Sequence, residues 1–102
     1  MRPTVFAALA LMLLPASALA QSRAEVLVKR YQLELQQCLG RNAGHASAQP
    51  EATRDTVADY AAKQCEQAYI KKVTGRKLME AAQARIEVDM MAYQLAERIL
   101  SH

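Results

Sequence analysis

Cys38 and Cys65 are the residues with the most specific chemistry in this sequence, because two cysteines can form a disulfide or carry out thiol exchange. No other cysteine is present, and their separation of 27 positions excludes a Cys-x-x-Cys redox motif. In an oxidising compartment one intramolecular disulfide is expected, and closing a loop of this length stabilises a small domain by roughly 3.5 kcal/mol. Two free buried thiols, or a disulfide between two chains, are the alternatives.

The N-terminal segment indicates such a compartment. A short positive start is followed by an apolar run over residues 5–14, which Pro15 interrupts, and an Ala-x-Ala pattern ends at Ala20. We therefore predict a signal peptide over residues 1–20, cleaved before Gln21. The apolar region is shorter than the roughly 20 residues of a membrane-spanning helix, and no cysteine follows the cleavage point for lipid attachment. The expected product is periplasmic or secreted through bacterial Sec-type export, without a stable membrane anchor.

The other residues able to do chemistry do not form a recognisable site. His45 and His102 are the only histidines, so neither a hydrolase triad nor a zinc site can be assembled. Met79, Met90 and Met91 have the sulfur ligands of a copper site, but methionines at helical spacing more often pack against neighbouring helices. Motifs for phosphate loops, haem attachment and metalloproteases are also missing from the sequence. We therefore expect no enzymatic activity, no metal and no cofactor.

The composition after cleavage indicates one small helical domain. Residues 21–102 comprise 82 residues with a formal net charge of +2, because Arg2 leaves with the signal peptide. This charge is too small to favour nucleic acid as a partner. The core must be built from aliphatic side chains, alanine and four tyrosines, and such a thin core is often supplemented by a covalent crosslink.

The first predicted helix spans Ser22 to Leu39. Ser22 followed by Glu25 has the spacing of a capping box, which satisfies backbone donors at a helix start. Val26 and Leu33 lie opposite the apolar face, either as isolated surface residues or as a strip for a partner. The apolar face itself is a regular seam formed by Ala24, Val28, Tyr31, Leu35 and Cys38.

The second predicted helix spans Ala52 to Val73. Gly40 is expected to end the first helix, Arg41–Gln49 forms a loop, and Pro50 suits the first turn that follows. Gly75 then marks either a turn or a kink within one longer helix. The buried face of the second helix is predicted to contain Val57, Ala61, Cys65 and Ala68, with Ala58, Tyr60 and Tyr69 at its edges.

The third predicted helix, from Arg76 to Leu100, is expected to be the longest and to contact two neighbours at once. Arg85 and Asp89 are four residues apart in the middle of its broad apolar face. We interpret them as an ion pair that fixes helix register, or as the floor of a groove that a ligand fills. The apolar residues form two lobes, one with Ala82, Ile86, Tyr93 and Leu100 and the other with Ala81, Val88, Ala92, Leu95 and Ile99.

These elements predict an all-α fold, either a small three-helix bundle or two helices plus one long helix kinked at Gly75, stapled by the disulfide. In a plain hairpin folded at the predicted loop, Cys38 would lie opposite Ala52, thirteen residues from Cys65. That is about 20 Å along a helix, whereas a disulfide needs its Cα atoms within roughly 7 Å. The disulfide therefore predicts a staggered pair, in which the first helix slides along the second.

The expected function is protein binding rather than catalysis, in an exported helical protein that acts as a chaperone, inhibitor, immunity protein or assembly factor. Its partner would be another exported protein or a second copy of this chain. The alternative is binding of an anionic small molecule or lipid by the basic turn between the second and third helices, together with a groove lined by Arg85. In a purely structural interpretation, the same cations complement the negative end of the helix dipole at a helix C-terminus. The candidate interaction residues are Lys71, Lys72, Arg76, Lys77, Arg85 and Asp89.

Processing of the N-terminus is directly testable. The intact mass of the exported protein is expected to correspond to a chain that begins at Gln21, or to its pyroglutamate form, because the cleavage pattern ends at Ala20. Recovery of the full-length chain from the membrane fraction would contradict the predicted signal peptide.

Overall fold

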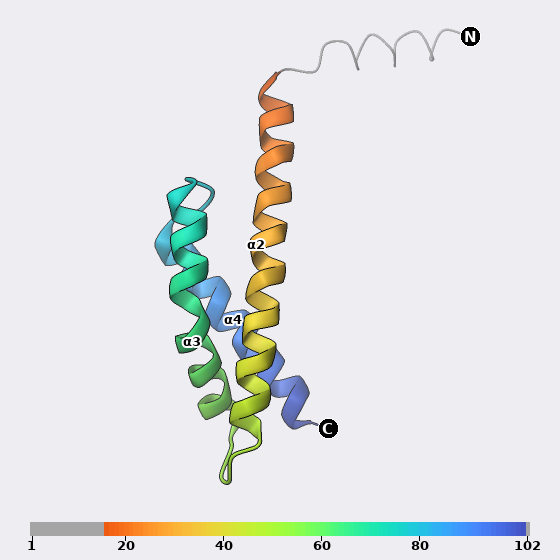
Figure 1. Ribbon diagram of the computed structural model, residues 1–102, viewed down its shortest axis with the longest axis vertical. Helices are drawn as coiled ribbons and strands as arrows, with labels where there is room; N and C mark the ends of the chain where they lie inside the picture. The colour runs from red at the N-terminus through yellow and green to blue at the C-terminus, as the bar shows by residue number, and fades with distance from the viewer. Residues whose placement is uncertain (1–15, 102) are drawn as a thin grey trace, which may run out of the picture.

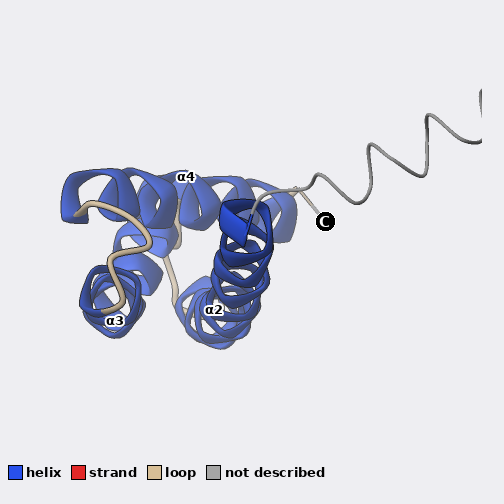
Figure 2. Cartoon of the chain, turned by 90° about the horizontal axis from the view of Figure 1, so that it is seen from above, coloured by secondary structure: helices blue, strands red, loops and turns tan. Residues whose placement is uncertain are grey.

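Three helices make up the part of the chain that the computed structural model describes, residues 16–101, with side chains from Arg23 onward. They are α2 (Ala16–Ser47), α3 (Arg54–Gly75) and α4 (Ala81–Leu100). α2 and α3 form an antiparallel hairpin, and α4 crosses one side of that pair (Figures 1 and 2). The predicted all-α three-helix bundle is confirmed. Most of the predicted signal peptide lies outside the described residues, and α2 begins within its last five positions.

α2 is longer at both ends than the sequence pattern predicts. It begins at Ala16, so Ser22 lies inside the helix and does not cap it, and it continues through Gly40 to Ser47. The predicted loop at residues 41–49 is therefore wrong. A glycine inside a helix costs only about 1 kcal/mol, and burial of Leu39 and Ala43 on the face next to Gly40 offsets that cost.

The connection between α2 and α3 is a short turn over residues 48–53. The sequence predicts Pro50 in the first turn of α3, but it lies within this connecting turn instead. Thr53 caps α3: the Thr56 amide donates to Thr53 Oγ1 at 3.2 Å, and the Thr53 amide donates to Thr56 Oγ1 at 2.9 Å. This reciprocal pair satisfies two backbone donors at the helix start.

Gly75 ends α3, so of the two alternatives at this position the turn is the correct one, and α3 and α4 are two helices rather than one continuous kinked helix. The residue in the left-handed conformation is Lys77, with φ of 55°, rather than a glycine. The Leu78 amide donates to the Val73 carbonyl at 2.8 Å and the Lys77 amide to the Thr74 carbonyl at 3.0 Å, which is a Schellman ending. This connection uses residues 76–80, so α4 is the shortest helix instead of the longest.

Cys38 and Cys65 form a disulfide that joins α2 to α3, with 5.9 Å between their Cα atoms. The predicted stagger of the two helices is wrong. Because α2 reaches Ser47 and α3 begins at Arg54, both cysteines lie almost equally far from the turn, and a plain hairpin brings them face to face. In this register Val28 of α2 lies beside the α3–α4 connection, where it lines a shared depression with Leu78.

The core lies where α4 crosses the hairpin, and much of it is alanine. α4 buries a residue at every fourth position, and these small side chains allow its backbone to approach α2 and α3 closely. Ala68 is exposed, so its predicted place on the buried face of α3 is wrong, and Tyr69, predicted at the edge of that face, is buried. The buried residues are Tyr31, Leu35, Leu39, Ala43, Val57, Ala58, Ala61, Ala62, Cys65, Tyr69, Val73, Ala84, Val88, Ala92 and Ala96.

Replacing the two glycines of α2 tests where this helix ends. Gly40→Ala and Gly44→Ala are each expected to raise the free energy of unfolding by about 0.5–1 kcal/mol, because alanine is the better helix former and open space surrounds both positions. Urea denaturation of the oxidised protein measures the change. If the helix ended at Leu39 with Gly40 left-handed, Gly40→Ala would instead destabilise the protein.

Candidate functional site

Arg85 and Asp89, the charged pair expected inside the bundle, are both exposed on α4, so the predicted buried placement is wrong. Within residues 16–101 neither side chain forms an ion pair. Only one of the two apolar lobes of α4 faces the hairpin, the one that contains Val88 and Ala92. The other lobe, with Ile86, faces solvent, and the two charged residues lie along the edge between buried and exposed faces.

The exposed lobe forms a compact apolar surface that we call the α4 outer face, defined by Ile86, Met90 and Tyr93. Their exposed fractions are 61%, 55% and 39%. Spacings of four and three residues place all three on one side of the helix, over two turns. Leu100 continues the same side toward the C-terminal end of α4 and is 38% exposed.

Tyr93 is held in place by the start of α3. The guanidinium carbon of Arg54 lies 4.4 Å from the centroid of the Tyr93 ring, and Arg54 Nη1 donates to Glu97 Oε1 at 2.9 Å. Glu97 lies one turn beyond Tyr93 on α4. The cation–π contact and the ion pair together restrict the ring, so the aromatic part of the α4 outer face presents a defined surface.

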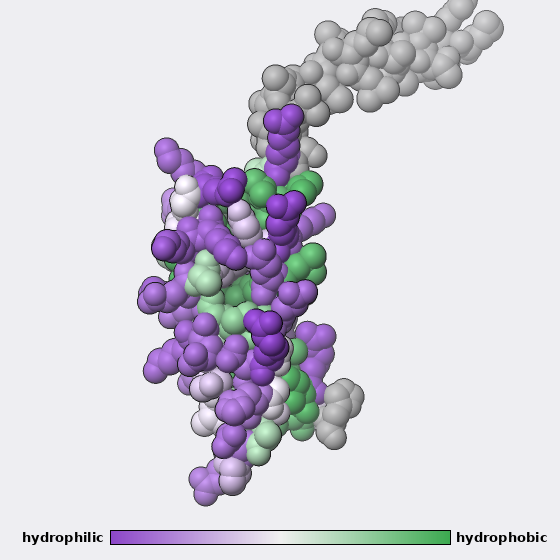
Figure 3. Space-filling view, in the orientation of Figure 1, coloured by the Kyte–Doolittle hydropathy of each residue, from purple (hydrophilic) through white to green (hydrophobic). Residues whose placement is uncertain are grey.

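A second, sparser apolar surface lies on the outward side of α2. Val26 and Leu33 are 58% and 59% exposed, which agrees with their predicted position opposite the seam. They are seven residues apart, and the exposed cations Lys29 and Arg30 lie between them. Figure 3 shows hydrophobic residues along the side of the molecule away from α3. Two separated side chains of this kind are common on protein surfaces.

The basic turn does not act as one cluster. Lys72 is engaged by α2: its ammonium group pairs with the Glu34 carboxylate and lies 5.7 Å from the centroid of the Tyr31 ring. Lys71, Arg76 and Lys77 are exposed. Lys71 and Arg85 line one shallow depression of about 320 Å³ between α3 and α4, together with Glu66, Gln67, Ala68 and Ile70. Asp89 is not part of this depression.

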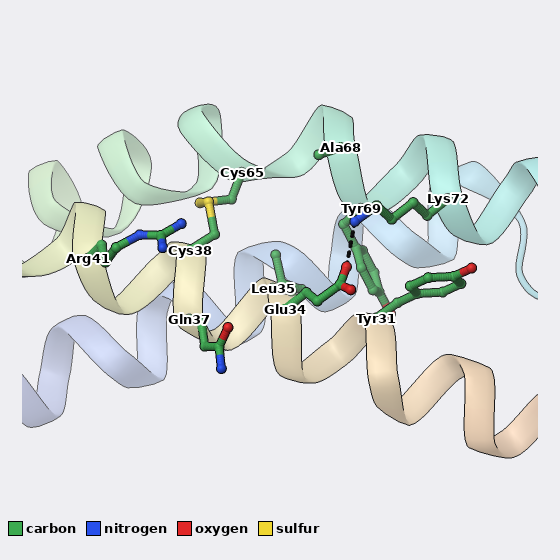
Figure 4. Close-up of a pocket in the computed structure, with 10 residues that line it drawn as sticks. All are labelled: Tyr31, Glu34, Leu35, Gln37, Cys38, Arg41, Cys65, Ala68, Tyr69 and Lys72. Carbon is green, nitrogen blue, oxygen red and sulfur yellow. Dashed lines mark hydrogen bonds and ion pairs between the residues drawn. A yellow bond between two sulfur atoms is a disulfide. The ribbon is translucent and has the colours of Figure 1, made fainter.

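A groove of about 340 Å³ runs between α2 and α3 beside the disulfide (Figure 4). Arg41 extends next to Cys38, while Glu34 and Lys72 point toward each other across the groove. The Asn42 amide nitrogen lies 3.6 Å from the sulfur atoms of both cysteines. Since the Glu34–Lys72 pair occupies the groove and neutralises its charge, Arg41 is the cation that remains on its wall.

A polar junction of all three helices is the feature that the sequence analysis missed. Gln32 of α2 donates a hydrogen bond through Nε2 to Glu87 Oε1 of α4. The hydroxyl of Tyr69, from α3, is buried and has no hydrogen-bond partner among the described residues. Burial and the nearby charge of Glu87 raise the pKa of Tyr69 to about 12. No short motif announces this junction, because its members are far apart in sequence.

Across residues 16–101, no group of three or more His, Cys, Asp or Glu side chains is placed to hold a metal ion. None of the described helices combines the length and apolar character that crossing a bilayer requires.

The dependence of the free energy of unfolding on pH above 10 tests the environment of Tyr69 in the polar junction. The pKa of Tyr69 rises on folding, so its contribution to stability is intact below pH 10 and is lost as the pH approaches 12. Over this interval we expect the free energy of unfolding of the wild type to fall by roughly 2–3 kcal/mol more than that of Tyr69→Phe, because the pKa shift is about two units. Urea unfolding at several pH values gives both curves, and parallel curves would contradict the raised pKa.

Comparison of the chain with protein-family models, with curated proteins and with solved structures gives no match.

Proposed function

We propose that this protein is an exported helical interaction protein that binds another protein through the α4 outer face and has no catalytic role. The carrying observation is the exposure of Ile86 and Met90, at 61% and 55%, one turn apart on the same side of α4. Export is itself part of the proposal, and the Cys38–Cys65 disulfide supports it because such bonds persist in oxidising compartments. Chaperone, inhibitor, immunity protein and assembly factor all remain within this class.

The spacing of the α4 outer face suits recognition by a helix or a groove. Apolar side chains at positions i, i+4 and i+7 are the usual anchors of helix-mediated binding. Full burial of a side chain such as Ile86 or Met90 contributes about 1.5–3 kcal/mol. Three such anchors contribute at most about 9 kcal/mol, and the cost of association offsets most of it, so micromolar affinity requires polar contacts at the rim as well.

Binding of an anionic small molecule or lipid headgroup is the second candidate. One observation favours it: Lys71 of the basic turn and Arg85 line the same depression. Glu66 lines it as well, and its negative charge weakens the attraction for an anion. Titration with inorganic sulfate and with vesicles of anionic lipid, followed through the amide signals of Lys71 and Arg85, separates a free anion from a membrane surface.

A matched pair of substitutions tests protein binding. Ile86→Asp places a charge on the α4 outer face, whereas Leu33→Asp makes the same change on α2 at an almost equal exposure of 59% against 61%. Proteins exported by the native cell are captured on the oxidised wild-type chain and on both variants, and each captured protein is then purified and titrated by calorimetry. We expect a partner that loses at least about tenfold in affinity to Ile86→Asp and keeps its affinity for Leu33→Asp.

Circular dichroism and urea unfolding establish that both variants are folded, as their exposed positions predict. Equal binding of the wild type and Ile86→Asp would contradict the proposed role of the α4 outer face. Loss of binding with Leu33→Asp alone would move the site to α2.

A further inference from the structure

We propose that the α4 outer face docks against the same face of a second copy of this chain, with the two α4 helices antiparallel about a two-fold axis. This inference rests on the proposed function and names a partner for the same surface. α4 alone covers one side of the hairpin, so its outer side carries no helix of its own chain within the described residues (Figure 2).

Side-chain sizes on the α4 outer face are complementary under such a two-fold axis. When Ile86 of one copy lies opposite Met90 of the second copy, the symmetry repeats that contact with the roles exchanged. A register that places Tyr93 opposite Ala82 of the second copy keeps Ile86 and Met90 within one residue, about 1.5 Å along the helix, of direct opposition. Ala82 is exposed and continues the face by one turn, so the largest side chain meets the smallest.

The charges at the edge of the face are complementary in the same register. In an antiparallel helix pair, each flank of one helix faces the same flank of the other. Arg85 then lies within one residue of direct opposition to Asp89 of the second copy, within reach of an ion pair, and the symmetry produces this ion pair twice. Both side chains are exposed and form no ion pair within residues 16–101, so they are available for it.

The charges also disfavour neighbouring registers. Sliding one copy by one helical turn brings either two Arg85 or two Asp89 side chains opposite each other, and like charges at close range are repulsive. The outward surface of α2 has no such pair of opposite charges. Between Val26 and Leu33 it is flanked by a cation on each side, Lys29 on one and Arg30 on the other. Two copies of that surface would bring cations together, so α4 is the helix suited to self-association.

The expected dimer is weak. One helix from each copy buries less than the roughly 1,200 Å² of total surface that stable complexes need. We therefore expect a reversible monomer–dimer equilibrium with a dissociation constant in the micromolar range, whose ion pairs set orientation and register more than affinity.

Sedimentation of the oxidised, exported protein over a concentration series tests the proposal. Arg85→Asp and Asp89→Arg each place like charges opposite each other, and each is expected to weaken the dimer by about tenfold or more. The double variant, Arg85→Asp with Asp89→Arg, exchanges the charges and is expected to recover wild-type dimerisation. Arg30→Asp is the matched control on α2 and should leave the equilibrium unchanged.

A wild-type protein that stays monomeric at all concentrations would overturn the proposal, as would a dimer that the single charge variants leave intact. A double variant that does not recover would overturn the antiparallel register. Capture of a different protein that Ile86→Asp abolishes, from a chain that sediments only as a monomer, would leave the proposed function standing and refute self-association alone.

Discussion

The register of the α2–α3 hairpin is the constraint on which the rest of the structure depends. The disulfide between Cys38 and Cys65 fixes it covalently near the middle, and the helix start at Thr53 fixes it at the turn. Contacts on either side of the disulfide fit the same alignment, with Glu34 against Lys72 toward one end and His45 against Tyr60 toward the other. A one-turn slip would break all of these contacts together, so the hairpin presents a single surface to α4.

That surface and α4 meet through small side chains, and this determines which residues remain outside. α3 buries Ala58, Ala61 and Ala62, and α4 buries three alanines and Val88 at every fourth position. An alanine seam permits close helix approach but covers only a narrow part of each helix. Ile86 and Met90 lie too far around α4 to be buried against the hairpin, and Tyr93 contacts it through the Arg54 side chain.

The sequence could predict the fold class, the disulfide and the outward position of Val26 and Leu33, since these follow from composition and periodicity. The end of α2 could not be predicted, because glycine at Gly40 signals a helix stop locally while burial of Leu39 and Ala43 continues the helix. Arg85 and Asp89 were misplaced for a related reason. Two apolar lobes on α4 look alike in sequence, and which lobe is buried depends on how α4 crosses the hairpin. The Gln32–Tyr69–Glu87 junction needs all three helices and leaves no local trace.

Self-association and partner binding, as proposed, compete for one surface. A partner that uses the α4 outer face must first separate the two copies, so its apparent affinity falls as the dimer becomes populated. The weakness expected for the dimer makes this competition mild at low concentration and strong where the protein accumulates. In the dimer, the second copy covers an apolar face that would otherwise favour aggregation. It does so in one register, because the Arg85 and Asp89 charges attract each other there and repel their like charges in the neighbouring registers. In the proposed dimer, Arg85 and Asp89, which form no ion pair within residues 16–101, supply the specificity that the apolar side chains alone do not provide.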